Sequence, residues 1–351
     1  MKKYFLLFLV LCITLLGACS QKTVQNEKSN EKVAEQKKLQ VYTTVYPLRY
    51  FTERIGGNFV EVSSVYPPGA NEHTFEPTQQ DMIKLADADL FFYIGLGLEG
   101  FVEKAKSALQ TSKVEFVPVT ANIPDEKFDI STGHIHVEDE DDDHSHDGED
   151  GHMEGEDHPA EDEHAAQKEH NDSGHHETDP HVWLSTSISP DLALAIKDAL
   201  IEKLPSQATI FEANYQTLVE ELQALDSQFK EMVAHASSNT FFVSHAAFGY
   251  IAGEYGLKQV PIAGLNSQDE PSQKKLVKLV ALANELNIKY ILFEQNVSSK
   301  LATTIQSEVG AEALVLHNLS VLTDEDIANN ETYFTLMERN IETLRKALGN
   351  K

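Results

Sequence analysis

An acidic, histidine-rich segment from Gly133 to Asp179 divides the chain and constrains its fold more than any other feature. The segment holds ten histidines among nineteen acidic residues, and Lys168 is its only basic residue. A stretch so charged and so poor in apolar side chains cannot bury a core, so residues 133–179 are expected to form a disordered loop. The folded body must be assembled from the sequence on either side.

The histidines of this loop also indicate metal binding. Imidazole is a common ligand of zinc, copper and nickel, and the interleaved carboxylates concentrate divalent cations electrostatically. The composition predicts an accessory metal loop without a defined geometry, and a solvated acidic loop with incidental histidines is the alternative. The ten residues are His134, His136, His144, His146, His152, His158, His164, His170, His175 and His176.

The N-terminus is typical of a lipoprotein signal peptide covering residues 1–18. Lys2 and Lys3 precede an apolar run from Tyr4 to Leu16 that is too short for a stable membrane span. Small residues then precede Cys19, which is expected to receive a lipid after cleavage. An ordinary cleaved signal is the alternative. The lipid would hold the protein to the cell membrane, on its extracytoplasmic face.

Residues 19–38 are polar and predict a flexible tether. The chain has two cysteines, and Cys12 lies within the signal, so no disulfide is expected. The formal net charge of -28 arises mostly in the histidine-rich segment. No basic stripe is available to neutralise phosphates, so nucleic acid is not an expected partner.

Short β-rich runs alternate with amphipathic helical patterns through the rest of the chain. This alternation predicts an α/β protein with two lobes and mostly parallel sheets, an N-terminal lobe over residues 39–205 and a C-terminal lobe over residues 236–351. The predicted strands are 39–45, 60–66, 89–94, 114–119, 240–244, 259–262, 290–294 and 313–316, and 272–286 and 300–309 are predicted helices.

A long helix over residues 206–235 is predicted to join the lobes. Its apolar positions recur at alternating steps of four and three, after a start signal at Pro205. A coiled-coil partner is the competing interpretation of this stripe. The positions are Phe211, Tyr215, Leu218, Leu222, Leu225, Phe229 and Met232.

Three histidines outside the acidic segment stand where metal ligands are expected. His73 lies in a Pro/Gly-rich loop after a predicted strand, His181 lies two residues before Trp183, and His245 ends an apolar strand. Ligands of open α/β sheets bind beyond the carboxyl ends of strands, so these residues predict a site in a cleft between the lobes. Three imidazoles suit zinc better than manganese, which favours oxygen ligands.

Three motifs carry a resemblance to a known family: PPGANEHTFEP at 67–77, DPHVWLS at 179–185 and SHAAFGY at 244–250. From about Leu39 to the C-terminus, the chain resembles the zinc-binding type of the metal-specific solute-binding lipoproteins of bacterial ABC importers. A histidine-rich insertion before the second motif is also common in zinc members.

The resemblance implies a monomeric, non-enzymatic receptor with two α/β lobes bridged by one rigid helix. It implies that Zn²⁺ is the transported ligand, held in the cleft by His73, His181 and His245 and passed to an ABC permease and its ATPase. The manganese and iron relatives usually carry a glutamate at the position of His245, so the histidine favours zinc.

The fourth ligand stays open. In some members a carboxylate in a C-terminal loop completes the site, but Ser320 occupies that position here and is a poor zinc ligand. Glu72, Glu294 or water are the candidates. The alternatives are that Glu72 and Glu294 are solvent-facing charges and that His317 is a surface histidine.

Three other functions are weighed against the zinc receptor. A manganese or iron receptor of the same family is less compatible with His245. A zinc hydrolase could use three histidines, but the chain has no His-Glu-x-x-His motif. The residues neither support nor exclude a surface adhesin.

Overall fold

The structure is a computed structural model that describes residues 37–131, 178–269, 271–296 and 299–349. The predicted signal peptide, nearly all of the tether and residues 133–177 of the histidine-rich segment lie outside these ranges. The described residues from Lys38 onward belong to one structural unit.

The first half of the chain forms a parallel sheet with the strand order β2-β1-β3-β4. Each strand falls inside a stretch that the sequence predicts as extended. Since β2 and β4 lie on opposite sides of the central pair, the topological switch point is at the carboxyl ends of β1 and β3. The strands are β1 (Leu39–Thr43), β2 (Val60–Ser64), β3 (Leu90–Tyr93) and β4 (Glu115–Pro118).

The second half repeats this topology with the order β6-β5-β7-β8, again with every pair parallel. Its switch point lies at the carboxyl ends of β5 and β7. The predicted α/β class with two parallel sheets is thus confirmed. The strands are β5 (Thr240–Val243), β6 (Lys258–Pro261), β7 (Tyr290–Phe293) and β8 (Glu312–Val315).

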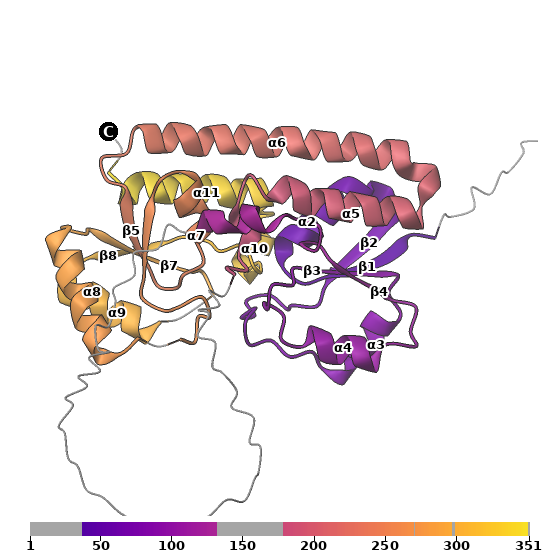
Figure 1. Cartoon of the computed structure of the whole chain (residues 1–351), viewed down its shortest axis with the longest axis horizontal. Coiled ribbons are helices and arrows are strands. Elements are labelled where there is room, and N and C mark those ends of the chain that lie inside the picture. Colours follow the sequence, from indigo (N-terminus) through magenta and orange to yellow (C-terminus); the bar gives the residue numbers. More distant parts are fainter. Residues whose placement is uncertain (1–36, 132–177, 270, 297–298, 350–351) are drawn as a thin grey trace, which may run out of the picture. The chain divides into compact units, whose positions relative to one another are not determined.

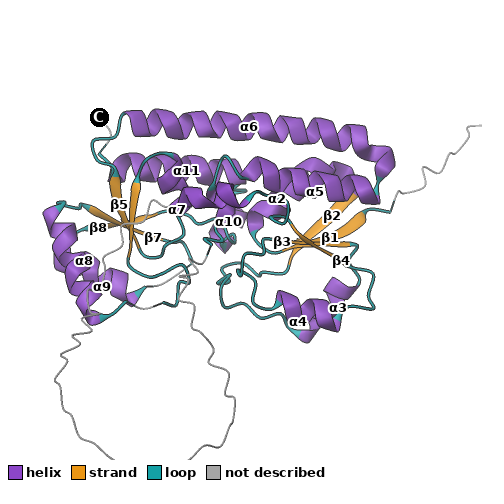
Figure 2. Cartoon of the chain, viewed as in Figure 1, coloured by secondary structure: helices purple, strands orange, loops and turns teal. Residues whose placement is uncertain are grey.

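Helices pack on both faces of the sheets (Figure 2). Helix α2 (Tyr46–Gly56) carries Pro47 in its first turn, where the fixed φ of proline suits a helix start. Helix α3 (Gln79–Ala86) begins with a capping box in which Thr78 and Asp81 exchange hydrogen bonds. The others are α4 (Val102–Ala108), α5 (Ser189–Lys203), α7 (Gly249–Glu254), α8 (Gln273–Glu285), α9 (Lys300–Val309), α10 (Asp324–Ala328) and α11 (Tyr333–Ala347).

The long helix α6 (Ala208–Ala234) runs alongside both sheets (Figure 1). Six of its seven predicted apolar positions are buried, and the seventh, Tyr215, is half-buried. The helix packs on α2, α5 and α11 of its own chain, so the stripe faces an intramolecular core. The prediction of one long linking helix is confirmed, and the coiled-coil alternative is wrong.

The hydrophobic core is shared between the lobes. One large cluster of buried side chains extends from Val41 on β1 through α6 to Leu348 after α11. A smaller cluster, which includes Phe242, Leu279 and Ile305, lies between the second sheet and helices α8 and α9. The lobes are therefore joined by packing as well as by α6. None of the helices described is both long enough and apolar enough to cross a membrane.

Candidate metal centre

His245 lies at the carboxyl end of β5, beside the switch point of the second sheet. Strand pairing continues up to the preceding residue, because Ser244 N donates to Leu292 O at 2.9 Å. The imidazole is 1% exposed. Its Nδ1 lies 2.6 Å from Glu294 Oε1, and its Nε2 lies 2.8 Å from the carbonyl oxygen of Leu265. Both ring nitrogens are engaged, so a metal ion can bind this ring only after one contact is released.

His73 lies in the loop that follows β2. The main-chain N–H of His73 donates to Asn71 Oδ1 at 3.0 Å, which fixes the loop locally. Two further bonds connect this loop to the C-terminal lobe: Asn71 Nδ2 donates to Ser267 Oγ at 2.9 Å, and Asn296 Nδ2 donates to Ala70 O at 2.8 Å. His73 is therefore held against loops that extend from the other sheet.

His181 is fully buried and is oriented by the carboxylate of Asp179. Asp179 Oδ1 lies 2.7 Å from His181 Nδ1 and accepts the main-chain N–H of His181 at 2.9 Å. A carboxylate on one ring nitrogen fixes the tautomer and directs the lone pair of the other nitrogen, Nε2, to the opposite side. The Tyr250 hydroxyl donates to the Asp179 carbonyl at 2.8 Å, and Trp183 packs edge-on against the imidazole.

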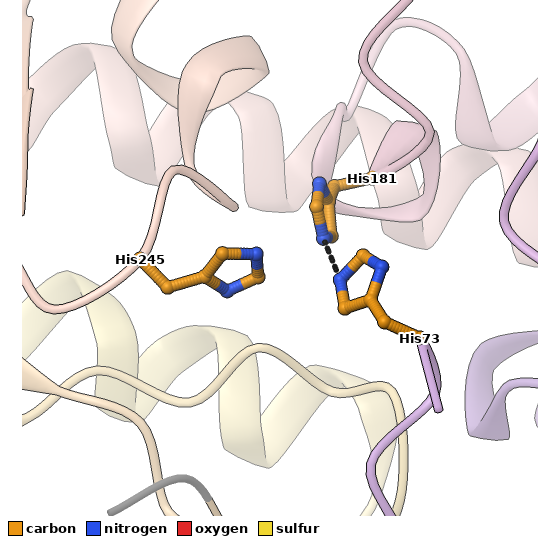
Figure 3. Close-up of side chains that lie close together, drawn as sticks. All are labelled: His73, His181 and His245. Carbon is orange, nitrogen blue, oxygen red and sulfur yellow. Dashed lines mark hydrogen bonds between the residues drawn. The ribbon is translucent and has the colours of Figure 1, made fainter. Parts of the chain in front are cut away.

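The structure brings these three histidines together (Figure 3). One nitrogen from each ring lies within 4.8 Å of the other two, and the Nε2 atoms of His181 and His73 are 3.3 Å apart. The ring of His245 faces the other two from the opposite lobe. Three imidazoles around one point could hold a metal ion, and coordination by them stays a prediction.

The pKa values of His73 and His245 are shifted in opposite directions. Burial, together with the neighbouring His181 and His245, lowers the pKa of His73 to about 2. Burial also lowers the pKa of His245, but the charge and hydrogen bond of Glu294 outweigh it and raise the pKa to about 9. Metals bind the neutral imidazole, so His73 is ready at neutral pH whereas His245 must lose a proton.

Two glutamates are buried beside the histidines. Glu72 is 2% exposed and Glu294 is 5% exposed, so the alternative that they are solvent-facing charges is wrong. Asn318 Nδ2 donates to Glu72 Oε1 at 2.9 Å and to Glu294 Oε2 at 2.8 Å. Burial and the like charge of Glu294 raise the pKa of Glu72 to about 7. Burial raises the pKa of Glu294, but His245 outweighs it and holds that pKa below its usual value.

The two carboxylates differ in whether one of their oxygens lacks a hydrogen-bond partner and could bind a metal ion. Both oxygens of Glu294 have partners, whereas Glu72 Oε2 accepts no hydrogen bond from the described residues. Neither glutamate belongs to the group of side chains whose ligand atoms lie within 4.8 Å of one another.

Ser320 and His317 have partners away from this group. Ser320 Oγ donates to Asn318 Oδ1 at 2.9 Å. His317 is 2% exposed, so the alternative of a surface histidine is wrong. Its Nε2 lies 3.1 Å from Asp326 Oδ2, and its Nδ1 accepts the main-chain N–H of Leu319 at 2.9 Å.

Sequence reasoning assigned no role to three residues that shape this centre. Asp179 was expected at the end of the disordered loop, but it is buried and orients the His181 ring, as an acidic residue two positions before a histidine can. Asn318 follows a predicted strand and thus lies at the carboxyl edge of the sheet, but nothing local distinguishes it from other loop amides. Leu265 acts through its backbone and leaves no signal in the sequence.

Comparison with known proteins identifies the family. The model of the family described as "Zinc-uptake complex component A periplasmic" matches residues 41–347. The chain belongs to this family of solute-binding receptors, in agreement with the resemblance carried by the three motifs.

Relatives and solved structures agree with this assignment. The high-affinity zinc uptake system protein ZnuA of Bacillus subtilis is 34% identical over 99% of this chain and 98% of its own length. The zinc-binding lipoprotein AdcA of Streptococcus pneumoniae serotype 4 is 36% identical over 99% of this chain, which spans only 61% of that protein. The Zn(II)-bound ZnuA-like domain of AdcA has a TM-score of 0.66 at 31% identity, covering 89% of this chain and 99% of that structure.

Proposed function

We propose that this protein is an extracytoplasmic receptor that captures Zn²⁺ and delivers it to the permease and ATPase of an ABC importer. The observation that carries the proposal is the convergence of His73, His181 and His245 within 4.8 Å. Membership of a zinc-uptake family supports the transporter as the partner. Zinc is the cargo in this role, and the three histidines are its proposed ligands.

Zinc is favoured over manganese by the donor set. Zinc takes nitrogen ligands in tetrahedral sites, whereas manganese favours sites rich in oxygen. The group within 4.8 Å offers three ring nitrogens, and neither nearby carboxylate belongs to it. A manganese or iron receptor is the alternative.

Glu72 is the better candidate for the fourth ligand. Its Oε2 is buried without a hydrogen-bond partner among the described residues, and such an atom gains the most from a cation. The two oxygens of Glu294 already contact His245 Nδ1 and Asn318 Nδ2. We expect Glu72→Gln to weaken zinc binding by more than about tenfold. Unchanged affinity in this variant would exclude Glu72 and leave Glu294 or water as the fourth ligand.

A competition titration tests the proposal. Metal-stripped protein is titrated with Zn²⁺ against a chelator and then challenged with Mn²⁺. We expect one tight zinc site that manganese does not displace and that is lost in His245→Ala. The exposed His235 on the turn after α6 supplies the control, and His235→Ala should bind as the wild type does. Equal competition by manganese would overturn the zinc assignment, and a tight site retained in His245→Ala would overturn the histidine site.

The membrane anchor is proposed from residues outside the described ranges. We expect a lipid on Cys19 to retain the protein at the extracytoplasmic face of the cell membrane. Labelled palmitate should enter the wild-type protein in cells and should not enter Cys19→Ala, which should be released into the medium or periplasm. Membrane retention of that variant would contradict the anchor.

A further inference from the structure

Asn318 lies beyond the carboxyl end of β8 and is fully buried. It contacts the segments that carry His73 and His181 directly, and it reaches His245 through the carboxylate of Glu294. We infer that Asn318 is a positioning residue of the metal centre, which fixes the three histidine-bearing segments relative to one another without binding metal itself. The inference rests on the proposed function, because it concerns the same site.

The side-chain amide of Asn318 joins the two lobes. Its Nδ2 donates to Oε1 of Glu72, the residue before His73, at 2.9 Å. The same nitrogen donates to Glu294 Oε2 at 2.8 Å, and the other oxygen of Glu294 holds His245 Nδ1 at 2.6 Å. The NH₂ group of Asn318 thus reaches the His73 loop through Glu72. It reaches His245 through the carboxylate of Glu294.

The backbone of Asn318 reaches the third segment. Trp183 Nε1 donates to the Asn318 carbonyl oxygen at 2.7 Å, and Trp183 lies two residues after His181. The indole also packs against the imidazole of His181, with 5.4 Å between the ring centroids. The position of the His181 ring therefore depends on where the backbone at Asn318 lies.

The surroundings of Asn318 allow only one orientation of its amide. Oδ1 accepts three hydrogen bonds, from Gln295 Nε2 at 2.9 Å, from Ser320 N at 3.0 Å and from Ser320 Oγ at 2.9 Å. A flipped amide would point its NH₂ group at these donors and its oxygen at two carboxylates. The neighbours therefore assign the nitrogen to the side of the glutamates.

The loop that carries Asn318 is anchored on its outer side. His317 N donates to Asn340 Oδ1 at 2.8 Å, and Asn340 Nδ2 donates to His317 O at 2.7 Å. Leu319 adopts φ of 58°, a left-handed conformation that costs a non-glycine residue about 1 kcal/mol or more. Such a conformation persists only where contacts on both sides enforce it. The loop is thus a fixed support for the amide.

The two glutamates cannot keep this arrangement unaided. Both are buried, and carboxylates that share a site repel one another when both are ionised. The Asn318 NH₂ group lies between them and bonds to both. Without this donor the carboxylates are expected to move apart, and the rings of His73 and His245 to lose their mutual geometry. Loss of such supporting contacts typically weakens metal binding about 10–100-fold.

Three variants of the full chain test the inference. Asn318→Ala removes the shared donor, and Ser320→Ala removes one bond that orients the amide. Asn214→Ala is the matched control, since Asn214 Nδ2 donates to Ile55 O at 2.9 Å and connects α6 to α2 away from the histidines. Each protein is measured for Zn²⁺ affinity, for the visible spectrum of bound Co²⁺, which reports coordination geometry, and for thermal unfolding without metal.

We expect Asn318→Ala to weaken zinc binding about 10–100-fold and to change the Co²⁺ spectrum. Ser320→Ala should also weaken zinc binding, by less than about tenfold. This variant tests the inference if Asn318→Ala does not fold. Asn214→Ala should lower the unfolding temperature and leave affinity and spectrum unchanged. Wild-type affinity and spectrum in both site variants would overturn the inference alone. Absence of a tight zinc site in the wild type would overturn the proposed function and the inference with it.

Discussion

At the residue scale, the candidate centre is defined by the contacts that the ring nitrogens of its histidines make. Asp179 holds Nδ1 of His181 and leaves Nε2 directed at His73, from which it lies 3.3 Å away. His245 has a partner on both nitrogens, Glu294 and the carbonyl of Leu265. The proposed binding of zinc to His245 requires the loss of one proton and of one hydrogen bond from this ring.

Zinc binding is predicted to be coupled to the release of a proton from His245. The pKa of this group is raised to about 9 in the metal-free protein, so the imidazole is protonated at pH 7.5. The pKa of His73 is lowered to about 2, so His73 contributes no proton there. Apparent zinc affinity should fall about tenfold per pH unit from pH 9 to pH 7, since one proton competes with the metal.

Calorimetry in two buffers of different ionisation enthalpy checks this coupling. About one proton should be released per zinc at pH 7.5. The control is Glu294→Gln, which keeps an acceptor for His245 but removes the negative charge, and it should release fewer protons. Affinity that does not change between pH 7 and pH 9 would rule out the coupling.

A second buried carboxylate, Glu99, lies at the switch point of the first sheet. It accepts hydrogen bonds from Thr44 Oγ1 at 2.8 Å, Ile94 N at 2.8 Å and Gly95 N at 2.9 Å. Thr44 follows β1, and Ile94 and Gly95 follow β3. Glu99 therefore lies at the switch point of the first sheet, just as His245 and Glu294 lie at the switch point of the second sheet.

Glu99 is predicted to make folding stability depend on pH. Burial outweighs its hydrogen bonds and raises its pKa from 4.5 to about 7. The folded state therefore binds more protons than the unfolded chain, and the contribution of Glu99 to stability is lost as pH rises through this window. The unfolding free energy of the wild type, measured relative to that of Glu99→Gln, should fall by up to roughly 3 kcal/mol from pH 4.5 to pH 8.

Urea unfolding of the metal-free proteins at several pH values measures this difference. The exposed Glu103, on α4, provides the matched control, and Glu103→Gln should follow the wild type across the range. A difference between wild type and Glu99→Gln that stays constant with pH would contradict the assignment.

At the scale of elements, α6 stabilises the fold through one face only. Its buried residues recur every three or four positions and pack on α2, α5 and α11, which include helices of both halves. Polar residues between them, such as Glu220 and Lys230, are exposed, in keeping with an amphipathic helix. Helix α6 therefore contributes buried side chains to the shared core in addition to connecting the two lobes.

Truncating this face is predicted to destabilise the whole unit. Leu222 is fully buried, so Leu222→Ala should lower the free energy of unfolding by about 2–5 kcal/mol. The exposed Glu220 lies on the opposite side of the same helix, and Glu220→Ala should change it by less than about 0.5 kcal/mol. Urea unfolding followed by circular dichroism and by Trp183 fluorescence provides the measurement. Near-identical stability of the two variants would show that α6 is not part of the core.

At the scale of the whole molecule, the shared core limits how the lobes can move. The large hydrophobic cluster includes residues from both halves, and hydrogen bonds such as Asn71 to Ser267 cross between them beside the histidines. A wide hinge opening would expose this core. Zinc entry and release are therefore expected to involve local changes, and the His245 to Leu265 contact is one that must open.

The histidine-rich segment is predicted to collect zinc for the tight site without forming part of it. All three proposed ligands lie in the described ranges, so deletion of residues 133–176 should leave zinc affinity within about twofold of the full chain. The many weak sites of the segment should raise zinc concentration nearby, so uptake by cells under zinc limitation should slow. Equal uptake by the deleted and full-length proteins at limiting zinc would contradict the collector role.

The sequence alone determined the α/β class, the eight strands, the linking helix and the three histidine-bearing segments. These features follow from local periodicity and from residues next to strand ends, so they can be read within short windows. The shared core, the burial of Glu72 and Glu294, the role of Asn318 and the pKa of His245 were decided only by tertiary structure. Asn318 and Glu72 are 246 positions apart, and His73 and His181 are 108 apart. Contacts over such separations depend on how the two sheets pack, and local patterns carry no record of them.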